Sequence, residues 1–106
     1  MQIYRTEVAI ANELPEVFPL EFRQWLLDNE HIWSGFVEEA TKIYQRGFVH
    51  YSSRTIIHVL RHHSALSEGT EWKINNNVSP YLSRLFDMSY PQMSGLFEYR
   101  RTKAES

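Results

Sequence analysis

Basic side chains gather in the second half of this chain, in an arrangement that could contact phosphate. From Lys42 to Ser67 the sequence holds no acidic residue, although it includes four basic residues and four histidines. Arg54 and Arg61 are seven residues apart, so on a helix they point in similar directions. Phosphate binding needs several cations on one face, because each neutralised phosphate releases counterions. The basic residues available for such a surface are Lys42, Arg46, Arg54, Arg61, Lys73, Arg84, Arg100, Arg101 and Lys103.

Three consecutive asparagines at positions 75–77 precede a serine and a proline. Asparagine side chains can read adenine edges and arginine side chains can read guanine, so this run could belong to a contact surface. Asparagine also tolerates turn conformations and can satisfy loose backbone groups, so the run could equally be a structural turn. The sequence leaves both interpretations open. The candidate nucleic-acid-binding residues are Arg54, Arg61, Asn75, Asn76, Asn77, Arg84, Arg100 and Arg101.

The net charge of −2 hides an uneven distribution. Residues 1–41 hold eight acidic and two basic residues, whereas residues 42–106 hold five acidic and nine basic ones. Such asymmetry predicts a polar molecule with one anion-attracting face. The total charge is not basic, however, in contrast to the usual nucleic-acid-binding domain. The acidic N-terminal third therefore indicates an alternative, a protein that occupies the basic groove of a partner.

Other chemistries find little support in the residue patterns. His58 and His62 are four apart and could share a metal ion, but zinc needs a third ligand and no cysteine is present. Glu38 and Glu39 are neighbours and would point about 100° apart on a helix, which is typical of a solvated face. The chain has no G-x-S-x-G elbow and no phosphate-binding glycine loop. We therefore expect no catalytic residues, no metal and no cofactor.

Length and composition predict one folded domain over residues 1–106. The chain is 42% hydrophobic and rich in aromatic residues, unlike a disordered protein. The absence of cysteine fits a reducing compartment. The first residues lack a secretory signal pattern, and no apolar run approaches the ~20 residues that span a bilayer. A cytoplasmic protein without a membrane partner is the expectation.

Periodicity and capping residues predict a mainly helical chain. Proline, serine and glycine mark most of the helix ends. Alternation of apolar and polar residues predicts two short strands. The expected helices cover 20–29, 30–46, 53–68 and 80–90, the strands 71–75 and 96–101, an N-terminal arm or edge strand 1–17, and a frayed tail 102–106.

Three- and four-residue spacing places most large apolar residues on the inner faces of these helices. Any of these aromatic residues that is instead exposed could pair with a second copy of the chain in a homodimer. The order of elements predicts an α+β fold, mainly α with a small β element, similar to a winged helix with extra N-terminal helices. The expected core residues are Phe22, Trp25, Leu26, Ile32, Trp33, Phe36, Val37, Ala40, Ile43, Tyr44, Ile56, Ile57, Leu60, Ser64, Tyr81, Leu82, Leu85, Phe86 and Met88.

Three segments, "GFVHYSSRTIIHVLRHHSA", "WKINNNVSPYLSRLF" and "PQMSGLFEYRR", together resemble a group of short proteins carried by phages, prophages and other mobile elements. The resemblance covers about residues 18–101 and departs at Glu30, where the group often has proline. It implies a mobile-element context and no particular chemistry. The matching positions are His50, Tyr51, Ser52, Arg54, Ile56, Ile57, Arg61, Asn75, Asn76, Asn77, Pro80, Arg84, Leu85, Phe86, Phe97, Glu98 and Arg100.

The sequence as a whole favours a non-enzymatic DNA-binding or regulatory accessory protein of a phage or other mobile element. The alternative is a protein–protein interaction module, an inhibitor or adaptor of a nucleic-acid enzyme that uses the acidic N-terminal third. DNA, a protein partner or a second copy of the chain are thus the expected partners.

Overall fold

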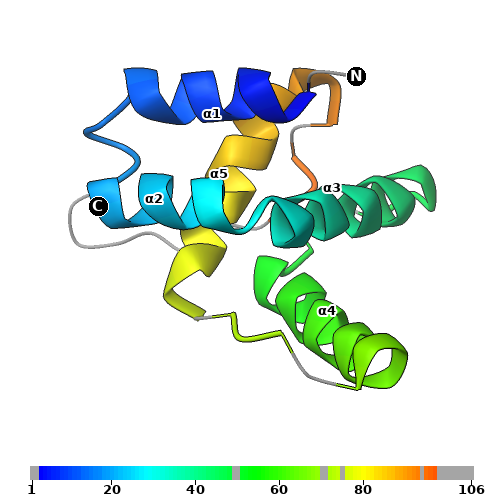
Figure 1. The fold of residues 1–106 in the computed structure, drawn as a ribbon. Helices are drawn as coiled ribbons and strands as arrows, with labels where there is room; N and C mark the ends of the chain where they lie inside the picture. The colour runs from blue at the N-terminus through cyan, green and yellow to red at the C-terminus, as the bar shows by residue number, and fades with distance from the viewer. Residues whose placement is uncertain (1–2, 49–50, 70–71, 75, 94, 98–106) are drawn as a thin grey trace.

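The computed structural model describes residues 3–48, 51–69, 72–74, 76–93 and 95–97, and the described chain is mainly helical (Figure 1). Two short 3₁₀ helices, η1 (Asn76–Val78) and η2 (Pro91–Met93), flank the last α-helix. The α-helices in this part of the chain are α1 (Ile3–Glu13), α2 (Leu20–Asp28), α3 (Glu30–Gln45), α4 (Ser53–Glu68) and α5 (Ser79–Ser89).

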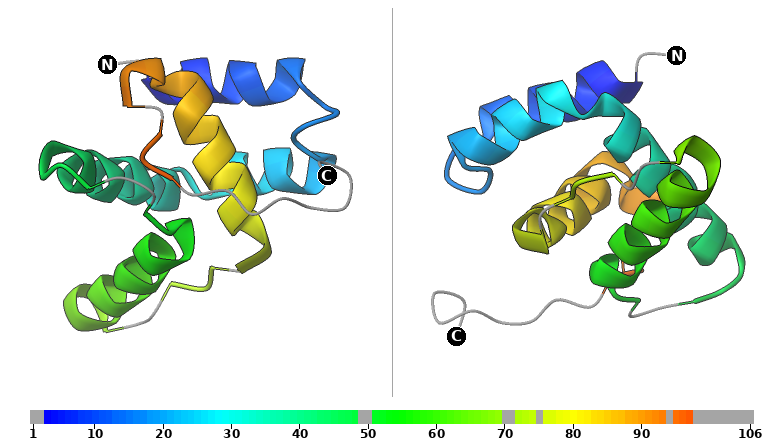
Figure 2. Two further views of the ribbon diagram at one scale, coloured as in Figure 1. Left: turned by 180° about the vertical axis from the view of Figure 1, so that it is seen from behind. Right: turned by 60° about the horizontal axis from the view of Figure 1, so that its bottom comes forward.

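Helix α5 lies at the centre of the molecule and packs against α1, α3 and α4. Helices α1 and α2 run side by side on one side of it, while α3 and α4 pack against each other on the other (Figures 1 and 2). Fully buried side chains from several elements meet where these helices converge, as expected for a single core of a small domain. The largest of them are Trp33, Phe18, Phe36, Phe86, Leu26, Ile32, Ile56, Ile57, Leu82 and Leu85.

The helix ends follow the local sequence. Asn29 ends α2, where its side-chain amide donates a hydrogen bond to the Trp25 carbonyl at 2.8 Å, and it also precedes the first residue of α3. Gly69 ends α4 with a left-handed φ of 72°, a conformation that glycine adopts without a steric penalty. The helices expected from residues 20 to 90 are confirmed in type, with boundaries shifted by at most one or two residues.

The N-terminal segment corrects the expectation of an arm or edge strand, because residues 3–13 form α1. Glu7 and Ala11 are buried and Leu14 is half-buried, so the inner face has the spacing of a helix. Because Glu7, a charged residue, lies on that buried face, the sequence does not show the apolar spacing of an amphipathic helix there. The helix packs along α5 and is part of the core.

The expected small β element is not seen in the described residues. Residues 72–74 have no regular secondary structure, and their backbone bonds to side chains of α4 instead of to a second strand. Phe97 forms an isolated parallel bridge with Tyr51, and residues 98–101 of the second expected strand lie outside the described part. The alternation of apolar and polar residues over 71–75 predicts a strand. The backbone of residues 72–74 instead forms hydrogen bonds with the side chains of Arg61 and Ser64 on α4.

Within the described residues, no helix is long and apolar enough to cross a membrane.

Candidate nucleic-acid interface

The outer face of α4 carries Arg54, an exposed member of the sequence-predicted basic residues. Arg54, His58 and His62 are exposed and recur at four-residue intervals, so they lie along one side of the helix. No acidic residue occurs from the first residue of α4 to Ser67. The inner side of the same helix buries Ile56, Ile57, Leu60 and Ser64. Packing of that apolar side against α3 and α5 therefore turns the basic side toward solvent.

The N-terminal ends of α4 and α5 meet at a hydrogen bond between two serine hydroxyls. Ser53 Oγ and Ser79 Oγ are 2.5 Å apart, and Ser79 is buried. Arg54 directly follows Ser53, and the exposed Asn77 lies two residues before Ser79. Arg54 and Asn77 therefore flank the same contact. Both helices also direct the positive ends of their dipoles to this junction, which favours an anion there.

Arg61 has a structural partner that its sequence position did not reveal. Its guanidinium donates a hydrogen bond to the carbonyl of Ile74, and its side chain is half-buried. Ser64 lies one turn further along α4; its hydroxyl donates to the Arg61 carbonyl and accepts from the Trp72 N–H, each at 2.8 Å. These bonds attach residues 72–74, which directly precede the asparagine run, to α4.

Of the remaining predicted site residues, the structure describes only the backbone of Asn76 and all of Arg84. Asn76 lies in η1, and Arg84 is half-buried on α5. Asn75, Arg100 and Arg101 lie outside the described residues, as does the side chain of Asn76. The structure therefore brings Arg54 and Asn77 to one junction and uses Arg61 to hold the neighbouring segment.

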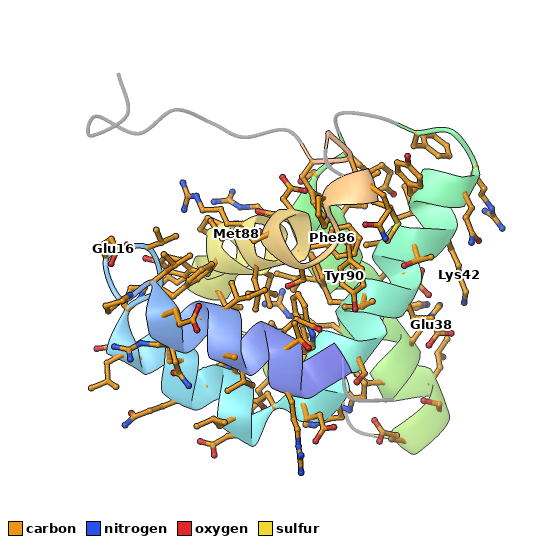
Figure 3. All side chains as sticks on the ribbon, turned by 90° about the horizontal axis from the view of Figure 1, so that it is seen from above. Glu16, Glu38, Lys42, Phe86, Met88 and Tyr90 are labelled. Carbon is orange, nitrogen blue, oxygen red and sulfur yellow. The ribbon has the colours of Figure 1, made fainter. Side chains whose placement is uncertain are left out.

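Lys42, another basic residue of the acid-poor segment, is paired within its own helix. Its Nζ lies 3.3 Å from Glu38 Oε1 and 3.6 Å from Glu39 Oε1 on α3. Figure 3 shows Glu38 and Lys42 on the outer side of α3. The hydrogen bond to Glu38, followed by the charges of Glu39 and Glu38, raises the pKa of Lys42. With its charge offset by two carboxylates, Lys42 adds little to a basic face.

The histidines of α4 do not form a metal centre with described residues. His58 and His62 are one turn apart, but the described part of the chain contains no cluster of three or more histidine, aspartate or glutamate side chains that could hold a metal ion.

A buried polar cluster joins α1, α3 and the end of α5, and the sequence analysis missed it. Trp33 Nε1 donates a hydrogen bond to the Glu7 carboxyl, and both side chains are about 1% exposed. Tyr90 lies beside them, in the space between α1, α3 and α5 (Figure 3). Its hydroxyl is buried near the Glu7 carboxyl and makes no well-formed hydrogen bond to a described residue. The spacing of Glu7, Ala11 and Leu14 is the only sequence signal that could have found this cluster.

Burial determines the acidity of both groups in this cluster. Burial raises the pKa of Glu7 above its usual value, and the hydrogen bond from Trp33 and the proximity of Tyr90 only partly oppose that shift. Burial and then the Glu7 charge raise the pKa of Tyr90 to about 12. A carboxyl so completely enclosed by the core cannot reach a substrate, so the geometry assigns Glu7 to packing and not to acid–base chemistry.

No family model, no curated protein and no solved structure matches this chain.

Proposed function

We propose that this chain is a non-enzymatic nucleic-acid-binding accessory protein, and that it binds through the outer face of α4 and the junction of α4 with η1 and α5. One observation carries the proposal: the exposed face of α4 that begins at Arg54 holds no acidic residue before Glu68, the last residue of the helix. A helix can enter the major groove of DNA, and its N-terminal end can contact phosphate. Asn77 would supply a directional hydrogen bond beside the cation of Arg54.

The mutual packing of α3, α4 and α5 supports the comparison with a winged-helix-like arrangement. Under the proposal these three helices form the helical part of such a unit, and α1 and α2 are the additional N-terminal helices. A phage or other mobile element would be its source, as the resemblance implies, and its place of action would be the cytoplasm.

The experiment is a fluorescence-anisotropy titration of a labelled duplex and a labelled single strand at ~50 and ~200 mM salt. Affinity that falls steeply with salt is the expected result. Arg54→Ala should reduce the slope of log affinity against log salt by about 1, the effect of losing one phosphate contact. Arg5→Ala is the matched control, because Arg5 is equally charged and exposed but lies on α1. Absence of binding at ~50 mM salt, or equal effects of the two variants, would refute the proposal.

A second candidate function is a protein-interaction module that uses the acidic N-terminal third, as an inhibitor or adaptor of a nucleic-acid enzyme. A separate observation favours it, the outward-facing leucines of α2 among exposed acidic residues. Helices α2 and α4 lie apart in the ribbon views, so the two functions would use different surfaces (Figures 1 and 2). The exposed acidic residues around α2 are Glu13, Glu16, Glu21, Asp28 and Glu30.

A further inference from the structure

Helix α2 has two apolar faces, and only one of them is covered. Phe22 and Leu26 are buried on the inner face, with Trp25 half-buried beside them. On the outer face Leu20 is 58% exposed and Leu27 is 56% exposed. Seven residues correspond to about two turns, so the two leucines point the same way, about 10 Å apart along the helix.

Acidic residues accompany this outer pair at the same spacing. Glu21 follows Leu20 and Asp28 follows Leu27, so a row of carboxylates runs beside the row of leucines. The arginine of this helix, Arg23, is half-buried and donates a hydrogen bond from Nε to the Phe18 carbonyl at 3.1 Å. Its guanidinium is therefore held at the start of α2, and the two exposed carboxylates outnumber its single positive charge.

We propose that the outer face of α2 docks a basic amphipathic helix of a partner protein. Apolar side chains of that helix would cover Leu20 and Leu27, and its lysines or arginines would lie beside Glu21 and Asp28. Helix-in-groove recognition uses the same combination, apolar anchors at helical spacing with charges at the edge. This inference rests on the second candidate function, the protein-interaction module, and is independent of nucleic-acid binding.

The negative charge of the outer face of α2 favours a basic helix over two other partners, a second copy of the chain and an anionic lipid surface. A second α2 packed against the first would bring Glu21 and Asp28 of both copies together, and like charges at close range oppose association. An anionic lipid surface would be repelled for the same reason. A basic amphipathic helix can contact the leucines with apolar side chains and the carboxylates with basic ones. Because only Leu20 and Leu27 provide apolar contacts, the complex would be of the weak, transient class.

The test uses the full chain and a synthetic amphipathic peptide with leucine and lysine at heptad positions. A scrambled peptide of the same composition separates the helical pattern from charge alone. The wild-type chain should bind the amphipathic peptide and not the scrambled one, in titration calorimetry. The double variant Leu20→Ser/Leu27→Ser should weaken binding roughly tenfold or more, since it removes two anchor contacts. Glu21→Gln/Asp28→Asn should make the remaining binding less dependent on salt.

Leu66→Ser is the matched control, because Leu66 is an even more exposed leucine on α4, 73% accessible. It should leave peptide binding unchanged, and circular dichroism should show that all three variants fold.

Equal loss of peptide binding in Leu66→Ser, or equal binding of the scrambled peptide, would overturn the proposed surface. Binding of the amphipathic peptide that survives Leu20→Ser/Leu27→Ser would place the interaction elsewhere and retain the module function. No binding of either peptide would refute both. Concentration-dependent dimers lost in Leu20→Ser/Leu27→Ser would assign this face to a second copy, against the proposal.

Discussion

The indole N–H of Trp33 donates a hydrogen bond to the carboxyl of Glu7 inside the core, and it joins α1 to α3 across 26 residues of sequence. Aromatic rings surround this pair, since Trp33 stacks on Phe36 with ring centres 5.8 Å apart and Tyr90 packs on Phe86 at 5.1 Å. A buried ionisable group costs free energy unless its partners compensate, and here they compensate only in part. We therefore expect the attachment of α1 to depend on pH.

Glu7→Gln should flatten that dependence. Because burial raises the pKa of Glu7, the folded state binds its proton more tightly than the unfolded chain does. The stability that this group contributes is complete below the unfolded pKa, near 4.5, and is lost as pH rises through the folded value. Urea unfolding of the variant should show greater stability than wild type at neutral pH. Glu13→Gln, at the exposed end of the same helix, is the control. Lower stability of Glu7→Gln at neutral pH would contradict the assignment.

Trp33→Phe should destabilise the fold by roughly 1–3 kcal/mol, because it removes the donor and leaves a buried acceptor without its partner. The same substitution should cost less in a Glu7→Gln background, in which the partner carries no charge. A double-mutant cycle from urea unfolding would measure this coupling, expected at about 0.5–3 kcal/mol for residues in contact. Additive effects of the two substitutions would mean that the hydrogen bond adds nothing beyond packing.

Arg61→Met should reduce stability by roughly 1–3 kcal/mol, because the buried Ile74 carbonyl loses a charged donor. Thermal or urea unfolding would measure it. Arg54→Met, an exposed position on the same helix, should stay within about 0.5 kcal/mol of wild type. If both substitutions cost the same, Arg61 does not hold residues 72–74 as described.

Gly35→Leu should destabilise the protein by about 1–3 kcal/mol through overpacking. A Cβ atom at Gly35 would lie 3.0 Å from the Leu60 side chain and 3.6 Å from the Trp72 ring, so α3 and α4 approach closely there. Ser34→Leu, at the adjacent exposed position of α3, is the control and should have little effect in the same unfolding experiment. Equal stability of the two variants would show that the helices can move apart without cost.

Helices α2 to α5 could be predicted from the sequence because their signals are local. Asn29, Gly69 and the Ser79–Pro80 pair mark ends, and the apolar spacing between them gives the inner faces. The expected core was largely correct: Ile32, Trp33 and Phe36 are buried, for example. The prediction was wrong for Met88, which is 41% exposed, and for Tyr44, which is 38% exposed. The Tyr44 hydroxyl donates a hydrogen bond to the Gln92 carbonyl at 2.9 Å.

The candidate site was less predictable, because residue type does not say which partner a side chain finds. Arg54 and Arg61 look equivalent in the sequence, seven apart on one helix. The fold leaves Arg54 exposed and bonds Arg61 to Ile74. Arg54 and Asn77 come to the same junction because the Ser53–Ser79 hydrogen bond joins segments 26 residues apart.

The sequence by itself therefore determined the helices from residue 20 onward, most of their buried faces and the separation of acidic from basic residues, since each of these depends on neighbours a few positions away. Tertiary structure alone decided that the first residues form a helix buried through an acidic side chain. It also decided that residues 72–74 bond to α4 and not to a strand. The physical reason is common to both. A polar group in the interior is stable only beside a partner, and the partners of Glu7, Trp72 and Ile74 come from other elements of the fold.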